Sequence, residues 1–353
     1  MTSEDLISAF SWLGAIFQDF IHPEGPDRNG TRERIENAVR KAETGNPWFT
    51  RKNILFSLDS WADELTREKL EKWLKPYRLE NHLQNSPVKI GVVMAGNIPM
   101  VGFHDFMCVL ASGNIFLGKL SHKDDTLLPE IAQIMTDKYP VFQSRIFFFD
   151  DHLTGQEAII ATGSQNTSRY FEYYFGKYPH IIRKDRKSIA ILTGEESPDE
   201  LEALGKDVFT YFGMGCRNIS KVFVPEGYNM AVLGDALSRF KKVLDHTRYR
   251  NNYEYQRSVF MVAGIPFSDN GCILFTESGQ LSSPVGVLQY EYYNHPKVLA
   301  GKLESLQENI QCIVSREKAP FRWCLPGQSQ HPALNDYADG MDTMEFLLSI
   351  KVK

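Results

Sequence analysis

The sequence predicts an α/β protein, with a doubly wound parallel-sheet domain, a second α/β domain and a helical region at the start. The first observation is that short, apolar, β-rich runs alternate with helical patterns from residue 89 onward. Such alternation is typical of parallel sheets with right-handed crossovers. The second observation is that residues 1–85 have a different hydrophobic pattern. Their apolar residues occur at helical spacing among many charged ones, as at 32–43 and 61–74.

Five runs in the first half are interpreted as buried strands because they are short, β-rich and mostly followed by turns. They are residues 89–95, 114–120, 145–150, 158–161 and 188–193. Helical patterns at 102–112, at 128–139 and up to residue 175 lie between them. Since such sheets bind ligands at the carboxyl ends of their strands, the turns after these runs are candidate ligand sites.

The second half repeats this alternation less regularly. Strands are expected at 219–225, 271–277, 286–293 and 311–315, helices at 198–212, 229–245, 251–263 and 296–309, and an edge strand at 344–350. The chain is therefore divided into a helical region (1–85) packed on a cofactor domain (86–205), a catalytic domain (206–325) and a C-terminal tail (326–353).

Composition excludes several classes of protein. Of 353 residues, 42% are hydrophobic and 24% charged, and the net charge is −5 without acidic or basic blocks, so a nucleic-acid partner is not expected. No apolar run approaches the roughly 20 residues of a membrane span, and the first residues lack a signal-peptide pattern. The five scattered cysteines form no metal-binding spacing, which favours reduced thiols, a cytoplasmic location and no metal.

Cys216 is the candidate nucleophile. It follows Gly213-Met214-Gly215, between the helical pattern 198–212 and the expected strand 219–225. A thiol on a glycine-rich turn can be presented to a substrate while its own backbone N–H points at the reacting oxygen. Those are the requirements of thioester chemistry, in which a thiolate attacks and a fixed donor stabilises the oxyanion. A buried structural cysteine is the alternative.

Two polar turns follow strands of the first half. Asn97 lies in Gly96-Asn97-Ile98-Pro99, where its amide could donate to a developing oxyanion or simply suit a tight turn. Gly163 and Ser164 open a helix, whose N-terminus could hold an anion or be capped by Ser164.

A basic cluster follows the strand 114–120. Lys119, Ser121 and Lys123 could contact an adenosine ribose or its 2′-phosphate, because lysine is a good point charge for phosphate. The alternative is a solvated loop. No G-x-G-x-x-G is present, so a nucleotide would be held in another way than by the usual dinucleotide fingerprint.

The chain order of these motifs resembles the aldehyde dehydrogenase superfamily and, within it, the Lux-type acyl-CoA reductases, the fatty acid reductases of bioluminescence systems. The resemblance covers roughly residues 85–350 and is carried by these segments: 94–99, 112–119, 161–164, 212–218 and 334–347.

The resemblance implies the role of each residue. In that family, the cysteine that matches Cys216 attacks the carbonyl carbon of the substrate. The residue that matches Asn97 donates to the oxyanion, together with the backbone N–H of the cysteine. The position of Lys119 contacts the adenosine ribose, and the turn at 163–164 lies near the cofactor pyrophosphate. The acid that usually follows the lysine is replaced by His122 beside Lys123, which favours NADPH over NADH.

Two departures from the family pattern bear on the reaction. Oxidising members carry a Glu that activates water against the thioester, and Arg183 occupies that position here. An acyl group on Cys216 should then resist water and be reduced by hydride or passed to another acceptor. A second Glu, which holds the nicotinamide ribose, is also missing, and Gln280 is its nearest equivalent.

The expected activity is therefore NADPH-dependent reduction of an acyl-CoA or acyl-protein to the fatty aldehyde, an oxidoreductase reaction on an oxo group. An acyl-protein synthetase is a candidate partner, and a homo-oligomer is expected by analogy. Two alternatives stay open: an acyltransferase that uses the same acyl-cysteine without hydride transfer, and a non-catalytic subunit that retains the fold.

Overall fold

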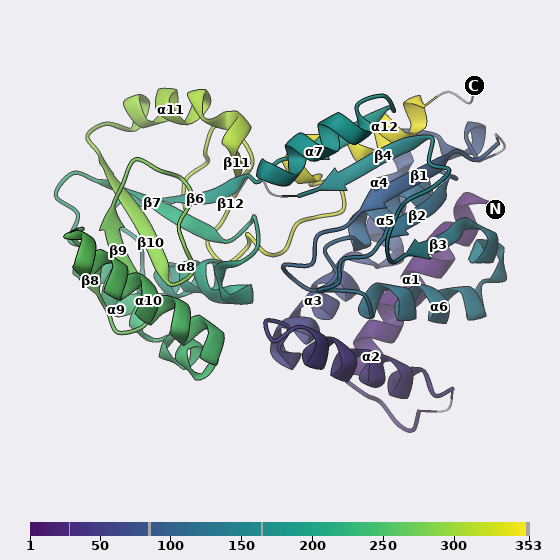
Figure 1. The fold of residues 1–353 in the computed structure, drawn as a ribbon, viewed down its shortest axis with the longest axis horizontal. Helices are drawn as coiled ribbons and strands as arrows, with labels where there is room; N and C mark the ends of the chain where they lie inside the picture. Colours follow the sequence, from purple (N-terminus) through teal and green to yellow (C-terminus); the bar gives the residue numbers. More distant parts are fainter. Residues whose placement is uncertain (28, 84–85, 164, 351–353) are drawn as a thin grey trace. The chain divides into compact units, whose positions relative to one another are not determined.

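The computed structural model describes residues 1–27, 29–83, 86–163 and 165–350, and the chain forms two compact units (Figure 1). The first unit comprises Met1–Lys184 and Ala333–Lys353, and the second comprises Asp185–Pro332. The chain passes from the first unit to the second and back again, so that its tail belongs with its beginning.

The first unit begins with four helices, in the region 1–85 that was expected to be mostly helical: α1 (Ser3–Ile21), α2 (Thr31–Gly45), α3 (Arg51–Glu64) and α4 (Arg67–Leu74). The helical pattern at 61–74 comprises the end of α3 and the whole of α4. Three of the four helices have a threonine as N-cap, and α2 has Gly30. Thr2 forms a capping box with Asp5, and the Thr50 side chain accepts from the Asn53 N–H at the start of α3. Such caps satisfy N–H groups that have no partner within the helix.

A five-stranded parallel sheet follows, in the order β3-β2-β1-β4-β5. Its strands are β1 (Lys89–Val93), β2 (Ile115–Lys119), β3 (Ile146–Phe149), β4 (Ala158–Thr162) and β5 (His180–Arg183). Three helices connect them: α5 (Phe103–Ala111), α6 (Leu127–Lys138) and α7 (Gln165–Phe175). Because all the strands are parallel, the turns after β1, β2 and β4 lie at one edge of the sheet.

The second unit holds a seven-stranded sheet in the order β12-β11-β6-β7-β10-β9-β8. Its strands are β6 (Lys187–Ile191), β7 (Ile219–Pro225), β8 (Ser268–Asp269), β9 (Leu274–Glu277), β10 (Val287–Tyr293), β11 (Ile310–Val314) and β12 (Trp323–Cys324). Only the pairing of β8 with β9 is antiparallel among the described strands.

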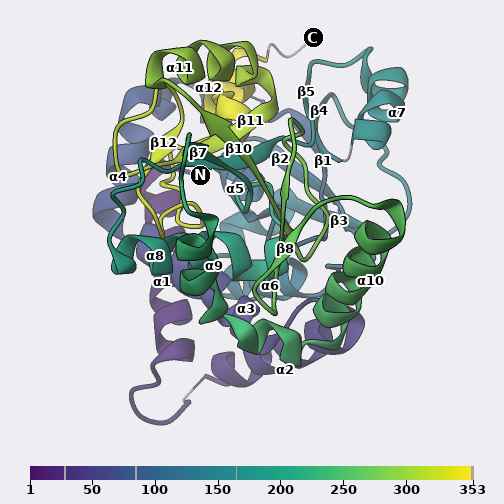
Figure 2. The ribbon, with the colours of Figure 1, turned by 90° about the vertical axis from the view of Figure 1, so that its left-hand side faces the viewer.

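Helices cover both faces of this second sheet. Helix α11 (Pro296–Ser305) lies over one face, and α8 (Pro198–Phe209), α9 (Met230–Ser238) and α10 (Thr247–Ala263) lie on the other (Figures 1 and 2). Beneath α11, Phe223 and Ile189 of the sheet pack against Leu299 and Leu303 of the helix. The α/β class, with helices on both faces of mostly parallel sheets, is therefore confirmed.

One expected strand belongs to another sheet, another is a helix, and the helix expected at 229–245 ends at Ser238 and is followed by a 3-10 turn at Lys241–Asp245. The run at 188–193 is strand β6 of the second sheet, where it pairs with β7 and β11, and the fifth strand of the first sheet is β5. The expected boundary between the cofactor domain and the catalytic domain, at residue 205, consequently lies inside the second unit. The tail at 344–350 is not an edge strand but helix α12 (Thr343–Ser349), which packs on α5 and buries Met344 and Leu347.

Along the described parts of the chain, no helix has both the length and the apolar content needed to cross a bilayer.

Candidate functional site

Cys216 lies on an exposed turn of the second unit, directly after a strained 3-10 turn. Helix α8 ends at Phe209, earlier than the pattern to residue 212 predicted, and a 3-10 turn Thr210–Gly213 follows. Tyr211, Phe212 and Gly213 have φ values of 52°, 60° and 76° in this turn. A left-handed conformation costs energy in residues other than glycine, and such strain clusters at functional sites. The thiol-bearing residue itself is exposed, as a nucleophile must be.

Hydrogen bonds hold the turn from inside the unit. The buried Asn218 side chain accepts from the Gly215 N–H at 2.8 Å and donates to the carbonyl oxygens of Asp207 and Thr210 at 2.9 and 2.7 Å. The hydroxyl of Ser188, on β6, donates to the Cys216 carbonyl at 2.9 Å. The turn is thus fixed to the end of α8 and to the centre of the sheet.

An aromatic contact supports the strained part of the turn. The Phe212 ring stacks on His246 with 4.1 Å between ring centroids and an interplanar angle of 26°. His246 is in turn the N-cap of α10, since its side chain accepts from the Tyr249 N–H. Stacking of this kind compensates part of the cost of the left-handed backbone at Phe212.

Asn97 lies in the first unit, on the turn after β1, and is half-buried. The turn is held by its neighbours: the Asn46 amide donates to the carbonyl oxygens of Gly96 and Lys123 at 3.4 and 3.1 Å, and Ser57 donates to that of Pro99 at 3.2 Å. A Cβ on Gly96 would lie 2.5 Å from the Ser121 hydroxyl, so only glycine allows these two turns to meet.

The basic cluster lies beside this turn. Lys119 ends β2, and its Nζ donates to the carbonyl oxygens of Leu120 and Asp150 at 3.0 and 2.5 Å. Ser121 is half-buried and Lys123 is exposed. The Asn97 turn and the Ser121–Lys123 loop therefore lie side by side. The Lys119 ammonium connects the ends of β2 and β3.

Gly163 follows β4 and precedes α7. A Cβ there would lie 2.8 Å from the Phe171 ring and 3.1 Å from Thr167, so the glycine lets α7 pack closely on the end of the strand. Ser164 lies outside the described residues. Gly163 thus occupies the expected place at the carboxyl edge of the first sheet.

Asp124 follows the basic cluster directly in the chain. The residue is half-buried, its Oδ1 is shielded from solvent, and its Oδ2 accepts from the Met100 N–H at 3.0 Å. Burial raises the pKa of Asp124 to about 7. Its Oδ1 has no hydrogen-bond partner among the described residues. Met100 has a φ of 62°, so the carboxyl group holds a strained residue of the Asn97 turn.

Arg183, which occupies the position of the Glu in the family pattern, is part of the interior of the first unit. Its guanidinium donates to both oxygens of Asp105, at 2.5 and 2.7 Å, and to the Thr343 hydroxyl at 3.0 Å. Nearby, the carboxylate of Asp185 pairs with Lys187 at 2.7 Å. This stretch supplies ion pairs to the fold rather than a base aimed at a thioester.

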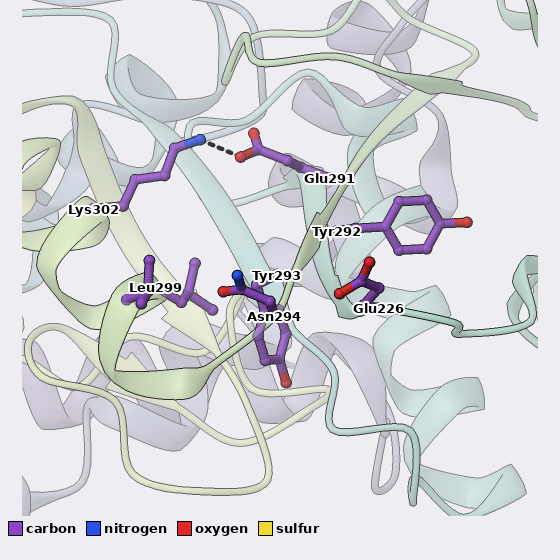
Figure 3. Close-up of a pocket in the computed structure, with 8 residues that line it drawn as sticks. Glu226, Glu291, Tyr292, Tyr293, Asn294, Leu299 and Lys302 are labelled. Atoms are coloured by element: carbon purple, nitrogen blue, oxygen red, sulfur yellow. Dashed lines mark hydrogen bonds and ion pairs between the residues drawn. The ribbon is translucent and has the colours of Figure 1, made fainter.

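A separate pocket of about 300 Å³ lies in the second unit, at the carboxyl ends of β7 and β10 (Figure 3). Glu291 on its wall pairs with Lys302 and with the buried Lys221. Burial acts to raise the pKa of Glu291, but the two ammonium groups outweigh it and lower that pKa. The Glu291 carboxylate is thus already neutralised by two ammonium groups of this chain.

The predicted site residues fall into two groups. Asn97, Lys119, Ser121, Lys123 and Gly163 lie at one edge of the first sheet, and Cys216 belongs to the second unit. Sequence reasoning missed the residues that hold these turns, among them Ser188 and Asn218. Asn218 had a local signal, since an Asn two residues after Cys216 can bond to the backbone of its own turn.

The chain has two α/β units, each built on a mostly parallel sheet, and the cysteine turn lies between β6 and β7 of the second sheet. This fold is similar to that of the aldehyde dehydrogenases. An aldehyde dehydrogenase from Bacillus cereus in complex with NAD⁺ is similar with a TM-score of 0.61 and 12% identity, over 89% of this chain and 72% of that one. An NAD-dependent aldehyde dehydrogenase from Sinorhizobium meliloti is similar with a TM-score of 0.62 and 11% identity, over 94% and 74% of the two chains.

An NADP-dependent enzyme from E. coli is also similar, with a TM-score of 0.60 and 9% identity over 91% of this chain and 78% of that one. At these identities the likeness is one of fold. No protein-family model and no curated protein sequence matches the chain.

Proposed function

We propose that this chain reduces a fatty acyl thioester, carried by coenzyme A or by a protein, to the fatty aldehyde with NADPH. The observation that carries the proposal is the exposed Cys216 on a turn that Ser188 and Asn218 hold, directly after the strained 3-10 turn Thr210–Gly213, in a chain with the aldehyde dehydrogenase fold. A fold of this kind brings a thiol nucleophile and a nucleotide site into one protein, which is what the reaction requires.

The thiolate of Cys216 would attack the carbonyl carbon of the substrate thioester. A new C–S bond forms, the bond to the substrate's own sulfur breaks, and the acyl group remains on the enzyme while the coenzyme A thiolate leaves. The Asn97 amide and the Cys216 N–H would donate to the oxyanion of the tetrahedral intermediate. Such donors are effective because they are already oriented before the charge develops.

The residues at the edge of the first sheet fit an anionic nucleotide. Lys123 offers an exposed ammonium, Ser121 a hydroxyl, and Gly163 a strand-to-helix turn at the carboxyl edge where parallel sheets bind ligands. When bound there, NADPH would supply the hydride that reduces the enzyme-bound thioester to the level of the aldehyde. Lys123 beside His122, in place of an acid, favours a cofactor with a 2′-phosphate.

The second half of the reaction regenerates the thiol. Collapse of the thiohemiacetal oxyanion breaks the C–S bond, releases the aldehyde and returns the electron pair to the Cys216 sulfur. The burial of Arg183 against Asp105 supports this direction of reaction, because the segment that carries a base in oxidising enzymes here supplies no free carboxylate to activate water.

Covalent labelling tests the nucleophile. With a radiolabelled long-chain acyl-CoA and no NADPH, the wild-type protein should become labelled and the Cys216→Ala variant should not. Cys324→Ala is the matched control, because it removes a half-buried thiol of the same unit and should leave labelling intact. Normal labelling of Cys216→Ala would refute the proposal.

NADPH oxidation in the presence of acyl-CoA then separates reduction from transfer. Oxidation in proportion to aldehyde formed supports a reductase. Labelling of Cys216 that is discharged to an added thiol, with no oxidation of NADPH, identifies an acyltransferase instead. If only a protein-borne acyl group is reduced, the donor is the product of an acyl-protein synthetase rather than free acyl-CoA.

A further inference from the structure

We infer that Ser188 and Asn218 are positioning residues for Cys216, because they fix the two peptide groups on either side of its α-carbon. The inference deepens the proposed function and rests on it for its catalytic consequence. The hydrogen bonds themselves lie wholly within the second unit.

Asn218 fixes the peptide group that precedes the cysteine. The Asn218 N–H donates to the Gly215 carbonyl at 3.1 Å. This carbonyl and the N–H of Cys216 belong to one planar peptide group, so a bond to the first sets the direction of the second. The Asn218 side chain adds the bond from the Gly215 N–H and anchors the turn to the carbonyl groups at the end of α8.

Ser188 fixes the peptide group that follows the cysteine. Its hydroxyl donates to the Cys216 carbonyl at 2.9 Å, and it is fully buried on β6, between β7 and β11 of the sheet. The thiol of Cys312, on β11, hydrogen-bonds to the same hydroxyl at 3.1 Å. A buried hydroxyl with a partner on the neighbouring strand has little freedom to turn away.

Fixing both peptide groups fixes φ and ψ of Cys216, since these are the only soft backbone torsions between them. The direction of the Cα–Cβ bond and that of the N–H are then set together. Cys216 carries both the nucleophilic thiol and an oxyanion donor, its own N–H. Because both groups are oriented before the reaction, no free energy is needed to orient them in the transition state.

Ser188→Ala tests the inference, with Ser220→Ala as the matched control. Ser220 lies on the neighbouring strand, and its hydroxyl bonds to the carbonyls of Ser188 and Leu281 rather than to the cysteine turn. With decanoyl-CoA, Ser188→Ala should lower kcat about five- to tenfold, the usual net value of one hydrogen bond, and leave KM within twofold. Ser220→Ala should have near wild-type kcat.

Ser188→Thr supplies the rescue, because it retains the hydroxyl and should restore most of kcat. Equal kcat in Ser188→Ala and Ser220→Ala would overturn the inference, and so would a normally melting Ser188→Thr that recovers nothing.

Amide hydrogen exchange is a second test, and its result does not depend on the proposed reaction. The backbone amides of residues 215–218 should exchange faster in Ser188→Ala than in the wild type and in Ser220→Ala. If the wild type fails to oxidise NADPH with acyl-CoA, the proposed function fails, and the exchange result still decides whether Ser188 holds the turn. Unchanged exchange in Ser188→Ala would overturn the inference by itself.

Discussion

Arg183 and Asp105 form a bidentate ion pair in the interior of the first unit. Their side chains are 7% and 6% exposed, respectively. Arg183 ends β5, Asp105 lies in the first turn of α5, and the Thr343 hydroxyl of α12 joins them. The pair therefore ties a strand, a helix and the C-terminal tail together. Removal of one partner leaves the other charge buried and uncompensated.

We accordingly expect Arg183→Met to lower the free energy of unfolding by about 3–5 kcal/mol, as broken buried pairs usually do. The double variant Arg183→Met with Asp105→Leu should recover most of that loss, because no buried charge remains. Urea unfolding followed by tryptophan fluorescence reports on this unit, which holds four of the five tryptophans: Trp12, Trp48, Trp61 and Trp73. A double variant no more stable than the single one would contradict this account.

This ion pair also shows where sequence reasoning stops. From residue 89 onward, the alternation of strands and helices predicted most elements near their observed bounds, because those patterns are local, but it missed the short strands β5, β8 and β12. The partners of Arg183 lie 78 and 160 residues away along the chain, and no local pattern marks them. For the same reason the run at 188–193 was identified as a strand but assigned to the wrong sheet, since pairing with β7 and β11 is a tertiary choice.

The C-terminal tail is a different kind of error, because a local signal was present. Asp342 caps α12 by accepting from the Glu345 N–H, and an acid followed three residues later by Glu is a helix start. At the candidate site, the cysteine and asparagine turns could be found from their glycines and neighbouring strands. The hydroxyl of Ser188 could not, since it reaches the turn from 28 residues away.

The cofactor preference depends on Lys123 in our proposal. Lys123→Ala should weaken NADPH binding about tenfold and leave NADH binding nearly unchanged, because a charge-assisted bond to a 2′-phosphate is lost and the ribose contacts are not. Fluorescence titration with each nucleotide measures the two Kd values. Lys138→Ala, which removes an exposed lysine of α6, is the control. Equal weakening for both nucleotides would argue against a 2′-phosphate contact.

Asn97 is expected to act in the transition state rather than in substrate binding. Asn97→Ala should lower kcat about 100- to 1000-fold, the usual effect of one lost oxyanion donor, with a much smaller change in KM. Steady-state kinetics with acyl-CoA and NADPH measures both. The exposed Asn309, replaced by Ala, controls for general effects of such a substitution. A large rise in KM at unchanged kcat would assign Asn97 to binding instead.

Asp124 should make the stability of the first unit depend on pH. Burial raises the pKa of its carboxyl group from 3.8 to about 7, so the folded protein holds this proton more tightly than the unfolded chain does. The stabilisation is then complete below about pH 4 and is lost as the pH rises through 7. Asp124→Asn has no proton to lose at this position.

The expected readout is the difference in unfolding free energy between the wild type and Asp124→Asn across this range. It should fall by up to about 4 kcal/mol between pH 4 and 7 and stay level above pH 8, because each unit of pKa shift corresponds to about 1.4 kcal/mol. Other titrating groups are common to both proteins and cancel in the difference. Two curves that run parallel from pH 4 to 8 would show that Asp124 does not titrate in this window.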